Sequence, residues 1–68
     1  MGLSPSELLV LRGAAQGLRN DDIAQVLGCG VKTVQTHITN VNVKLNTHNR
    51  TEAVMTAIKM GYIDIATL

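Results

Sequence analysis

Aromatic side chains are almost absent from this 68-residue chain, since Tyr62 alone makes up its 1% aromatic content. The core must therefore come from Leu, Ile, Val, Ala and Met, which predicts a small core of modest stability. Hydrophobic residues still make up 46% of the chain, so the composition indicates a folded domain rather than a disordered segment. This length leaves room for a single domain, which we predict to span residues 1–68.

Cysteine is equally scarce, because Cys29 is the only one. A single cysteine excludes an internal disulfide framework and fits a reducing compartment. Cys29 and the two scattered histidines show no metal-ligand spacing, and no set of nucleophile, base and oxyanion donors is visible, so we expect no metal, no cofactor and no catalytic residues. Because no apolar run approaches the roughly 18 residues of a membrane span, and no signal sequence is visible, we predict a cytoplasmic protein without a membrane partner.

Acidic residues are missing from the middle of the chain. The net charge of +1 is weak support for a nucleic-acid partner, but all five acids lie outside residues 23–51. The cationic and titratable residues of that segment are Lys32, His37, Lys44, His48 and Arg50. This part of the chain can therefore face an anion.

Capping signals and apolar spacing predict four helices and no strands. Ser4 and Glu7 form a capping box, and Pro5 suits the first helical position. Gly17 and Gly28 are expected to end the first two helices in the left-handed conformation. The predicted helices span about residues 5–16, 21–27, 31–45 and 50–60.

The second and third predicted helices lie very close together in the sequence. Asn20 is expected to cap the second helix, and Asp21 and Asp22 in its first turn complement the helix dipole. After Gly28, only Cys29 and Gly30 precede the third helix. Such a short connection forces two helices to cross steeply, which is typical of a helix-turn-helix motif.

The third predicted helix has three faces at about 100° per residue. Its core-facing stripe comprises Val31, Val34, Ile38, Val41 and Leu45. A second face comprises Lys32, Gln35, Thr36, Thr39 and Val43. A third comprises Thr33, His37, Asn40 and Lys44. The two polar faces carry no carboxylate, which phosphates would repel, and their short neutral side chains can approach base edges; the pattern therefore favours a DNA-reading helix.

From Leu3 to Ile63, the chain resembles the LuxR/FixJ-type (GerE-like) helix-turn-helix domain of bacterial transcription regulators. The matching segments, in chain order, read LSPSELLVLRGAAQGL, NDDIAQVLG, KTVQTHITNVNVKL and NRTEAVMTAIKMGYI. The resemblance implies an all-α, four-helix fold with helix 31–45 in the major groove of double-stranded DNA. It also implies an effector domain of a bacterial regulator, in particular a response regulator, with an N-terminal regulatory domain as a further partner and a nucleoid-associated location.

The resemblance also assigns site residues. It implies base contacts from Lys32, Gln35, Thr36 and Thr39. It implies contacts to the DNA backbone from Thr33, His37, Asn40, Lys44 and Arg50. Gln35 and Thr39 occupy positions where the family often has Lys, so either a lower DNA affinity or a different preferred sequence is expected relative to such relatives.

The fourth predicted helix has two apolar rows. Ala53, Ala57 and Met60 form the row expected in the core. The neighbouring patch comprises Val54, Met55 and Ile58. Because a domain this small has few ways to bury both rows, and because the resemblance implies dimerisation through the last helix, we expect this patch to meet its copy across a two-fold axis on inverted half-sites. The patch is too small to hold a dimer without DNA.

Simpler interpretations remain open at single residues, and three functional classes were compared. His37 and His48 could be ordinary surface histidines, and Cys29 a small apolar filler. The classes are a sequence-specific DNA-binding regulator, a helical protein-binding module without DNA contact, and an enzyme. The acid-free faces of helix 31–45 favour the first class.

Overall fold

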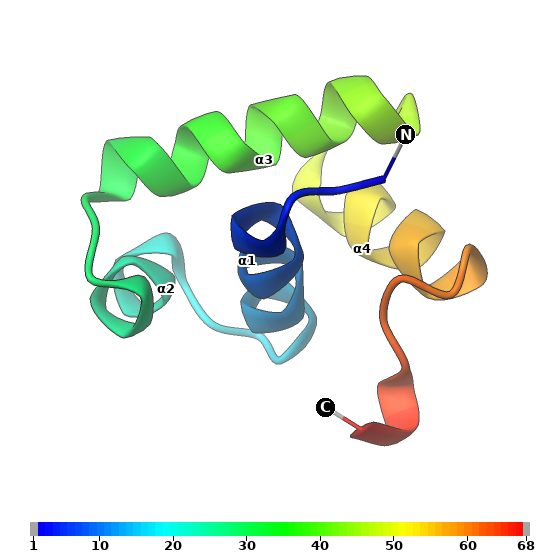
Figure 1. The fold of residues 1–68 in the computed structure, drawn as a ribbon, viewed down its shortest axis with the longest axis horizontal. Helices are drawn as coiled ribbons and strands as arrows, with labels where there is room; N and C mark the ends of the chain where they lie inside the picture. Colours follow the sequence, from blue (N-terminus) through cyan, green and yellow to red (C-terminus); the bar gives the residue numbers. More distant parts are fainter. Residues whose placement is uncertain (1, 68) are drawn as a thin grey trace.

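The computed structural model describes residues 2–67, and Met1 and Leu68 at the ends of the predicted domain lie outside the described residues. Over that range the chain forms four α helices and a short 3₁₀ helix (Figure 1). These are α1 (Pro5–Ala15), α2 (Asn20–Leu27), α3 (Val31–Leu45), α4 (Arg50–Lys59) and η1 (Ile65–Thr67). The predicted all-α, four-helix fold is confirmed, with every helix boundary within one residue of its predicted place; only η1 was not anticipated. None of the described helices is long and apolar enough to cross a membrane.

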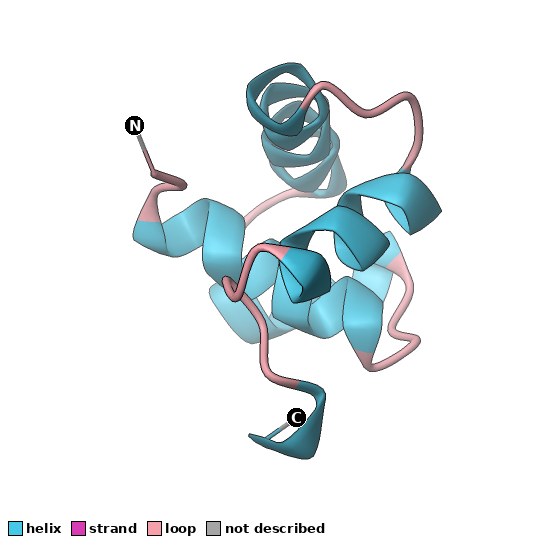
Figure 2. Cartoon of the chain, turned by 90° about the vertical axis from the view of Figure 1, so that its right-hand side faces the viewer, coloured by secondary structure: helices cyan, strands magenta, loops and turns pink. Residues whose placement is uncertain are grey.

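Helix α1 is the centre of the fold, because it packs against α2, α3 and α4. Helix α3 runs across the top of Figure 1, with α2 below one end and α4 below the other. The view turned by 90° shows α3 nearly end-on, again at the edge of the molecule (Figure 2). The face of α3 turned away from α1 therefore has no other helix of residues 2–67 over it.

Side chains cap the first and fourth helices at their N-termini. Ser4 Oγ accepts a hydrogen bond of 3.2 Å from the Glu7 N–H, and Glu7 Oε1 accepts one of 2.7 Å from the Ser4 N–H. This confirms the predicted capping box. At the start of α4, Asn49 Oδ1 accepts a hydrogen bond of 2.9 Å from the Glu52 N–H.

The start of α2 differs from the prediction. Asn20 is the first helical residue rather than the N-cap, and Arg19 takes the cap position without a side-chain hydrogen bond. Asp22 Oδ2 instead accepts from the Arg19 N–H at 3.3 Å. The Asn20 side chain accepts from Arg50 Nη1 at 3.0 Å, so a tertiary contact uses the oxygen that the local pattern assigned to capping.

Each helix ends in a left-handed residue that turns the chain back. These residues are Gly17, Gly28, Asn46 and Gly61. Asn46 has φ of 56°, a conformation that asparagine tolerates better than most side chains. The Thr47 N–H then donates to the Asn42 carbonyl at 2.9 Å, which satisfies one of the last carbonyls of α3.

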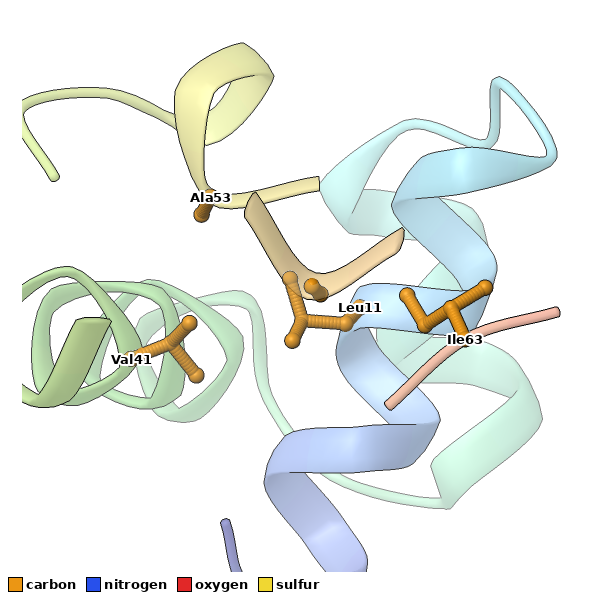
Figure 3. Packing of buried hydrophobic residues seen from close by; sticks show 5 residues of the cluster. Leu11, Val41, Ala53 and Ile63 are labelled. Carbon is orange, nitrogen blue, oxygen red and sulfur yellow. The ribbon is translucent and has the colours of Figure 1, made fainter. Parts of the chain in front are cut away.

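Two buried clusters hold α3 against the rest of the domain. The first comprises Leu11, Val41, Ala53, Ala57 and Ile63. The second comprises Val10, Ile23, Ala24 and Val34. Adjacent residues of α1, Val10 and Leu11, thus enter different clusters, and α3 contributes Val34 to one and Val41 to the other. Figure 3 shows Leu11 between Val41 and Ile63. The core stripe of α3 is therefore anchored at two levels two helical turns apart.

The end of α4 corrects one core assignment. Met60 was expected to complete the buried row with Ala53 and Ala57, but it is 59% exposed. Helix α4 ends at Lys59, and the turn through Gly61 brings Ile63 back to 2% exposure in the first cluster. An apolar row predicted from helical spacing holds only as far as the helix extends, so it does not apply to Met60, which follows the last residue of α4.

Candidate nucleic-acid interface

One exposed face of α3 carries the four residues for which base contacts were predicted. Lys32, Gln35, Thr36 and Thr39 are all exposed. Together with Asn40, they line a shallow, open depression along the helix. Val43 continues this face toward the C-terminal end of α3 and is 76% exposed. The structure thus brings the predicted base-contact residues onto one continuous surface.

Two hydroxyl groups on this face donate into the helix itself. Thr36 Oγ1 donates to the Lys32 carbonyl at 3.0 Å, and Thr39 Oγ1 donates to the Gln35 carbonyl at 3.0 Å. Both are bonds from residue i to residue i−4, a common arrangement for threonine within a helix. They leave the hydroxyl lone pairs and the methyl group of each threonine for a ligand.

The neighbouring face of α3 holds the residues predicted to contact the DNA backbone. Thr33, Asn40 and Lys44 are exposed, whereas His37 is half-buried. His48 lies outside α3, in the connection before α4, and its backbone N–H donates to Glu52 Oε1 at 2.8 Å. That contact gives His48 a local structural setting separate from the α3 faces.

Lys44 is also part of an ion pair that joins α3 to α1. Its Nζ lies 2.8 Å from Glu7 Oε1, and the side-chain exposures are 40% for Lys44 and 4% for Glu7. The hydrogen bond from Lys44, followed by the backbone hydrogen bond from Ser4, holds the pKa of Glu7 below its ordinary value, against the opposing effect of burial. A buried carboxylate therefore fixes the C-terminal part of α3 while part of Lys44 stays accessible.

Arg50, at the first position of α4, is used within the protein. Its Nη2 donates to the Leu18 carbonyl, and its Nη1 donates to Asn20 Oδ1 at 3.0 Å. Arg50 is half-buried. The guanidinium thus joins the start of α4 to the loop between α1 and α2, which is a positioning role rather than an exposed cationic surface.

The predicted pairing patch on α4 is only partly free. Met55 is 57% exposed. Val54 and Ile58 are half-buried and pack against the cluster of Leu11 and Val41. Met55 is therefore the most exposed member of this patch.

Within residues 2–67, no group of three His, Cys, Asp or Glu residues is arranged to hold a metal ion.

Comparison with known proteins identifies the architecture. Residues 1–57 match the family described as bacterial regulatory proteins, luxR family. The chain belongs to the LuxR family. This confirms the resemblance inferred from the helix-turn-helix segments, and the match includes α3 with its exposed face.

Relatives of this LuxR-family domain are transcriptional regulators. The chain is 44% identical over 63 residues to the quorum sensing-dependent transcriptional regulator VjbR of Brucella abortus, covering 93% of this chain and 24% of VjbR. It is 42% identical over 62 residues to the transcriptional activator LuxR of Aliivibrio fischeri, covering 91% of this chain and 25% of that protein. The chain thus spans about a quarter of the length of these curated relatives.

A solved structure has the same LuxR-type architecture. The crystal structure of the response regulator ChrA, from a heme-sensing two-component system, matches with a TM-score of 0.88 and 35% identity. The match covers 93% of this chain and 31% of the ChrA chain. It supports the four-helix arrangement over nearly the whole domain.

Sequence patterns revealed the polar faces of α3 but not the contacts that hold them. Glu7 was recognised as a capping residue, although its second partner, Lys44, is 37 positions away. The family resemblance implied a DNA-backbone contact for Arg50, and nothing in the sequence pointed to its partners Leu18 and Asn20, which lie in the α1–α2 loop and at the start of α2. The sequence shows only that no acidic residue lies within residues 23–51, around Lys44 and Arg50. This absence does not distinguish a DNA partner from a partner within the protein.

Proposed function

We propose that this domain binds double-stranded DNA sequence-specifically, as the effector domain of a bacterial transcription regulator. The observation that carries the proposal is the exposed face of α3, where Lys32 and Gln35 stand beside two threonines on a surface without carboxylates. Such a helix fits the major groove, and its neutral polar groups match base edges. Membership of the LuxR family supports the same function.

The two polar faces of α3 have different roles in this proposal. The base-reading group comprises Lys32, Gln35, Thr36 and Thr39. The group that contacts the DNA backbone comprises Thr33, His37, Asn40 and Lys44. Arg50 is moved from the second group to a positioning role, because it is half-buried and both of its terminal nitrogens donate to protein oxygens, whereas Lys44 stays exposed despite its contact with Glu7. The first group selects a sequence, and the second sets the register of the helix on the duplex.

Pairing on DNA and the rest of the regulator follow from the same proposal. Two copies meet through α4, around Met55 with Val54 and Ile58 at its margin, on inverted half-sites. The longer relatives and the similarity to ChrA support an N-terminal regulatory domain of the response-regulator type. A cytoplasmic, nucleoid-associated location follows from a DNA target.

Selection from a random duplex pool followed by a salt titration tests this function. We expect one enriched half-site in inverted pairs, and an affinity that falls as salt rises because phosphate contacts release counterions. A duplex with the enriched site scrambled is the matched control. Equal affinity for both duplexes would refute sequence-specific binding, and no measurable affinity for either would refute DNA binding altogether.

A further inference from the structure

The hydroxyl protons of Thr36 and Thr39 are already engaged before any ligand arrives. Each hydroxyl donates at 3.0 Å to a carbonyl one turn earlier in α3, although both side chains are exposed. A hydroxyl has one proton and two lone pairs. With the proton held by the helix, each side chain offers an outward acceptor and a methyl group.

These groups differ from those of the neighbouring residues on the same face. The Lys32 ammonium offers donors only, and the Gln35 amide offers both a donor and an acceptor. Along α3 the surface thus changes from a donor in the first turn to acceptors and methyl groups at positions 36 and 39. In a major groove that fits this surface, the bases must present an acceptor opposite Lys32 and a donor or a methyl group opposite Thr36 and Thr39.

We propose that Thr36 and Thr39 select A·T base pairs by contacting the thymine methyl group. This inference rests on the proposed function. In the major groove adenine and cytosine each present an amino donor, so the threonine acceptor does not distinguish A·T from G·C, whereas only thymine presents a methyl group. The hydrogen bond to the helix carbonyl fixes the threonine side chain and with it the position of its methyl group. It also prevents the hydroxyl from donating to the guanine acceptors N7 and O6.

Two substitutions separate the acceptor from the methyl group. Thr36→Val keeps the shape and a methyl group but removes the hydroxyl, and Thr36→Ser keeps the hydroxyl but removes the methyl group. Parallel selections from a random duplex pool with wild type and both variants identify the position that Thr36 reads, because its preference changes. The same pair at Thr39 reports the second position. Thr51→Val, at an exposed position of α4 outside both DNA-contacting groups, is the matched control and should leave every base preference unchanged.

We expect an A·T pair at both positions in the wild-type selection. At each one, the serine variant, which lacks the methyl group, should lower affinity about 3- to 10-fold, as expected for one lost apolar contact, whereas the valine variant should keep the A·T preference. Replacing thymine by uracil at that position should reproduce the loss in the wild type and cause no further loss in the serine variant.

Two results would overturn the inference, and a third would also refute the proposed function on which it rests. Enrichment of a G·C pair at the position altered by Thr36 or Thr39 substitutions would show that the threonine methyl group does not select thymine. Unchanged preferences in all four variants would show that neither threonine reads a base. Both outcomes leave the proposed DNA binding intact, whereas absence of any enriched sequence with wild type would refute the proposed function itself.

Discussion

Glu7 shows how one residue can serve two elements at once. Its carboxylate caps α1 through the Ser4 N–H and holds Lys44 of α3 at 2.8 Å. A carboxylate that is 4% exposed and has two donors is stabilised in its charged form, which is why its pKa falls. The orientation of α3 therefore depends on the charge of a residue in α1.

Glu7→Gln should lower the free energy of unfolding at neutral pH by about 1–3 kcal/mol, because a charged hydrogen-bonded pair is lost. Since the pKa of Glu7 is lowered on folding, its contribution is present above the unfolded pKa and is lost as the pH falls through the folded pKa. Urea titrations should show that the wild type loses more stability than Glu7→Gln below about pH 4.3. Glu52→Gln, at an exposed cap, is the control. An equal pH dependence of the unfolding free energy in wild type and Glu7→Gln would contradict the stabilising role assigned to the Glu7 carboxylate.

Arg50 and Lys44 both donate to groups of the protein, but only Lys44 also stands on an exposed face of α3. Their substitutions therefore separate a purely structural cation from one that is also proposed to contact DNA. Arg50→Ala should lower the free energy of unfolding by about 1–3 kcal/mol, because the Leu18 carbonyl and the Asn20 side chain lose their donor. It should leave the salt dependence of DNA affinity unchanged. Lys59→Ala, at an exposed position of α4, should change the unfolding free energy by less than about 0.5 kcal/mol.

Lys44→Ala should lower affinity for all DNA sequences, and it should also lower the free energy of unfolding, because the buried Glu7 carboxylate loses its charged donor. The salt dependence should fall by about one unit of slope per bound copy, as expected for one lost phosphate contact. Fluorescence titrations at several salt concentrations measure both slopes. A changed slope in Arg50→Ala, or an unchanged one in Lys44→Ala, would reverse the two roles.

At the scale of elements, α1 and α2 approach closely at a glycine. Gly13 is buried inside α1, and a Cβ atom placed there would lie 2.8 Å from Ile23 Cγ1 of α2. The Leu18 N–H also bonds to the Gly13 carbonyl at 3.0 Å, in the turn that ends α1. Gly13 therefore sets the spacing between the two helices that support α3 from below.

Gly13→Ala tests this spacing. Alanine would gain about 1 kcal/mol in helix propensity, but overpacking against Ile23 should cost about 1–3 kcal/mol, so we expect a net loss of stability. Gly30→Ser is the control: a Cβ there meets nothing within 4 Å, and the new N-cap of α3 should raise stability by a few tenths of a kcal/mol. Thermal unfolding of both variants measures the difference, and a stabilised Gly13→Ala would show that Ile23 moves aside at little cost.

At the scale of the whole molecule, the proposed function divides the surface of one small domain between DNA and a second copy of the chain. Val54 and Ile58 pack partly on the core, so an acid at either position would also weaken the fold. Met55, at 57% exposure, is the better position for testing the pairing surface. A substitution at Met55 avoids confusing a loss of pairing with a loss of folding, because α4 serves both in this proposal.

Met55→Asp should abolish cooperative occupancy of a duplex with two half-sites, while affinity for a single half-site stays within about two-fold, because pairing adds avidity only when both sites are present. Met60→Asp, at 59% exposure immediately after the end of α4, is the matched control and should remain cooperative. Sedimentation, circular dichroism and titration of both duplexes measure the effects. Cooperative binding by Met55→Asp would place the pairing surface elsewhere.

The sequence by itself determined the helices, their ends, the helix-turn-helix connection and the two polar faces of α3. These depend on local periodicity and capping, in which the interacting residues lie within about one turn of each other. Asn46 illustrates the point, because its tolerance of positive φ ends α3 where the sequence predicts.

Which charged side chains are held by other groups of the protein depends on the tertiary structure. Lys44 reaches Glu7 across 37 positions and Arg50 reaches Asn20 across 30, and neither pairing has a local signature. In the same way, Ile63 replaced Met60 in the core once the chain had turned back after α4. Such contacts depend on how helices pack, which no periodicity within one helix contains.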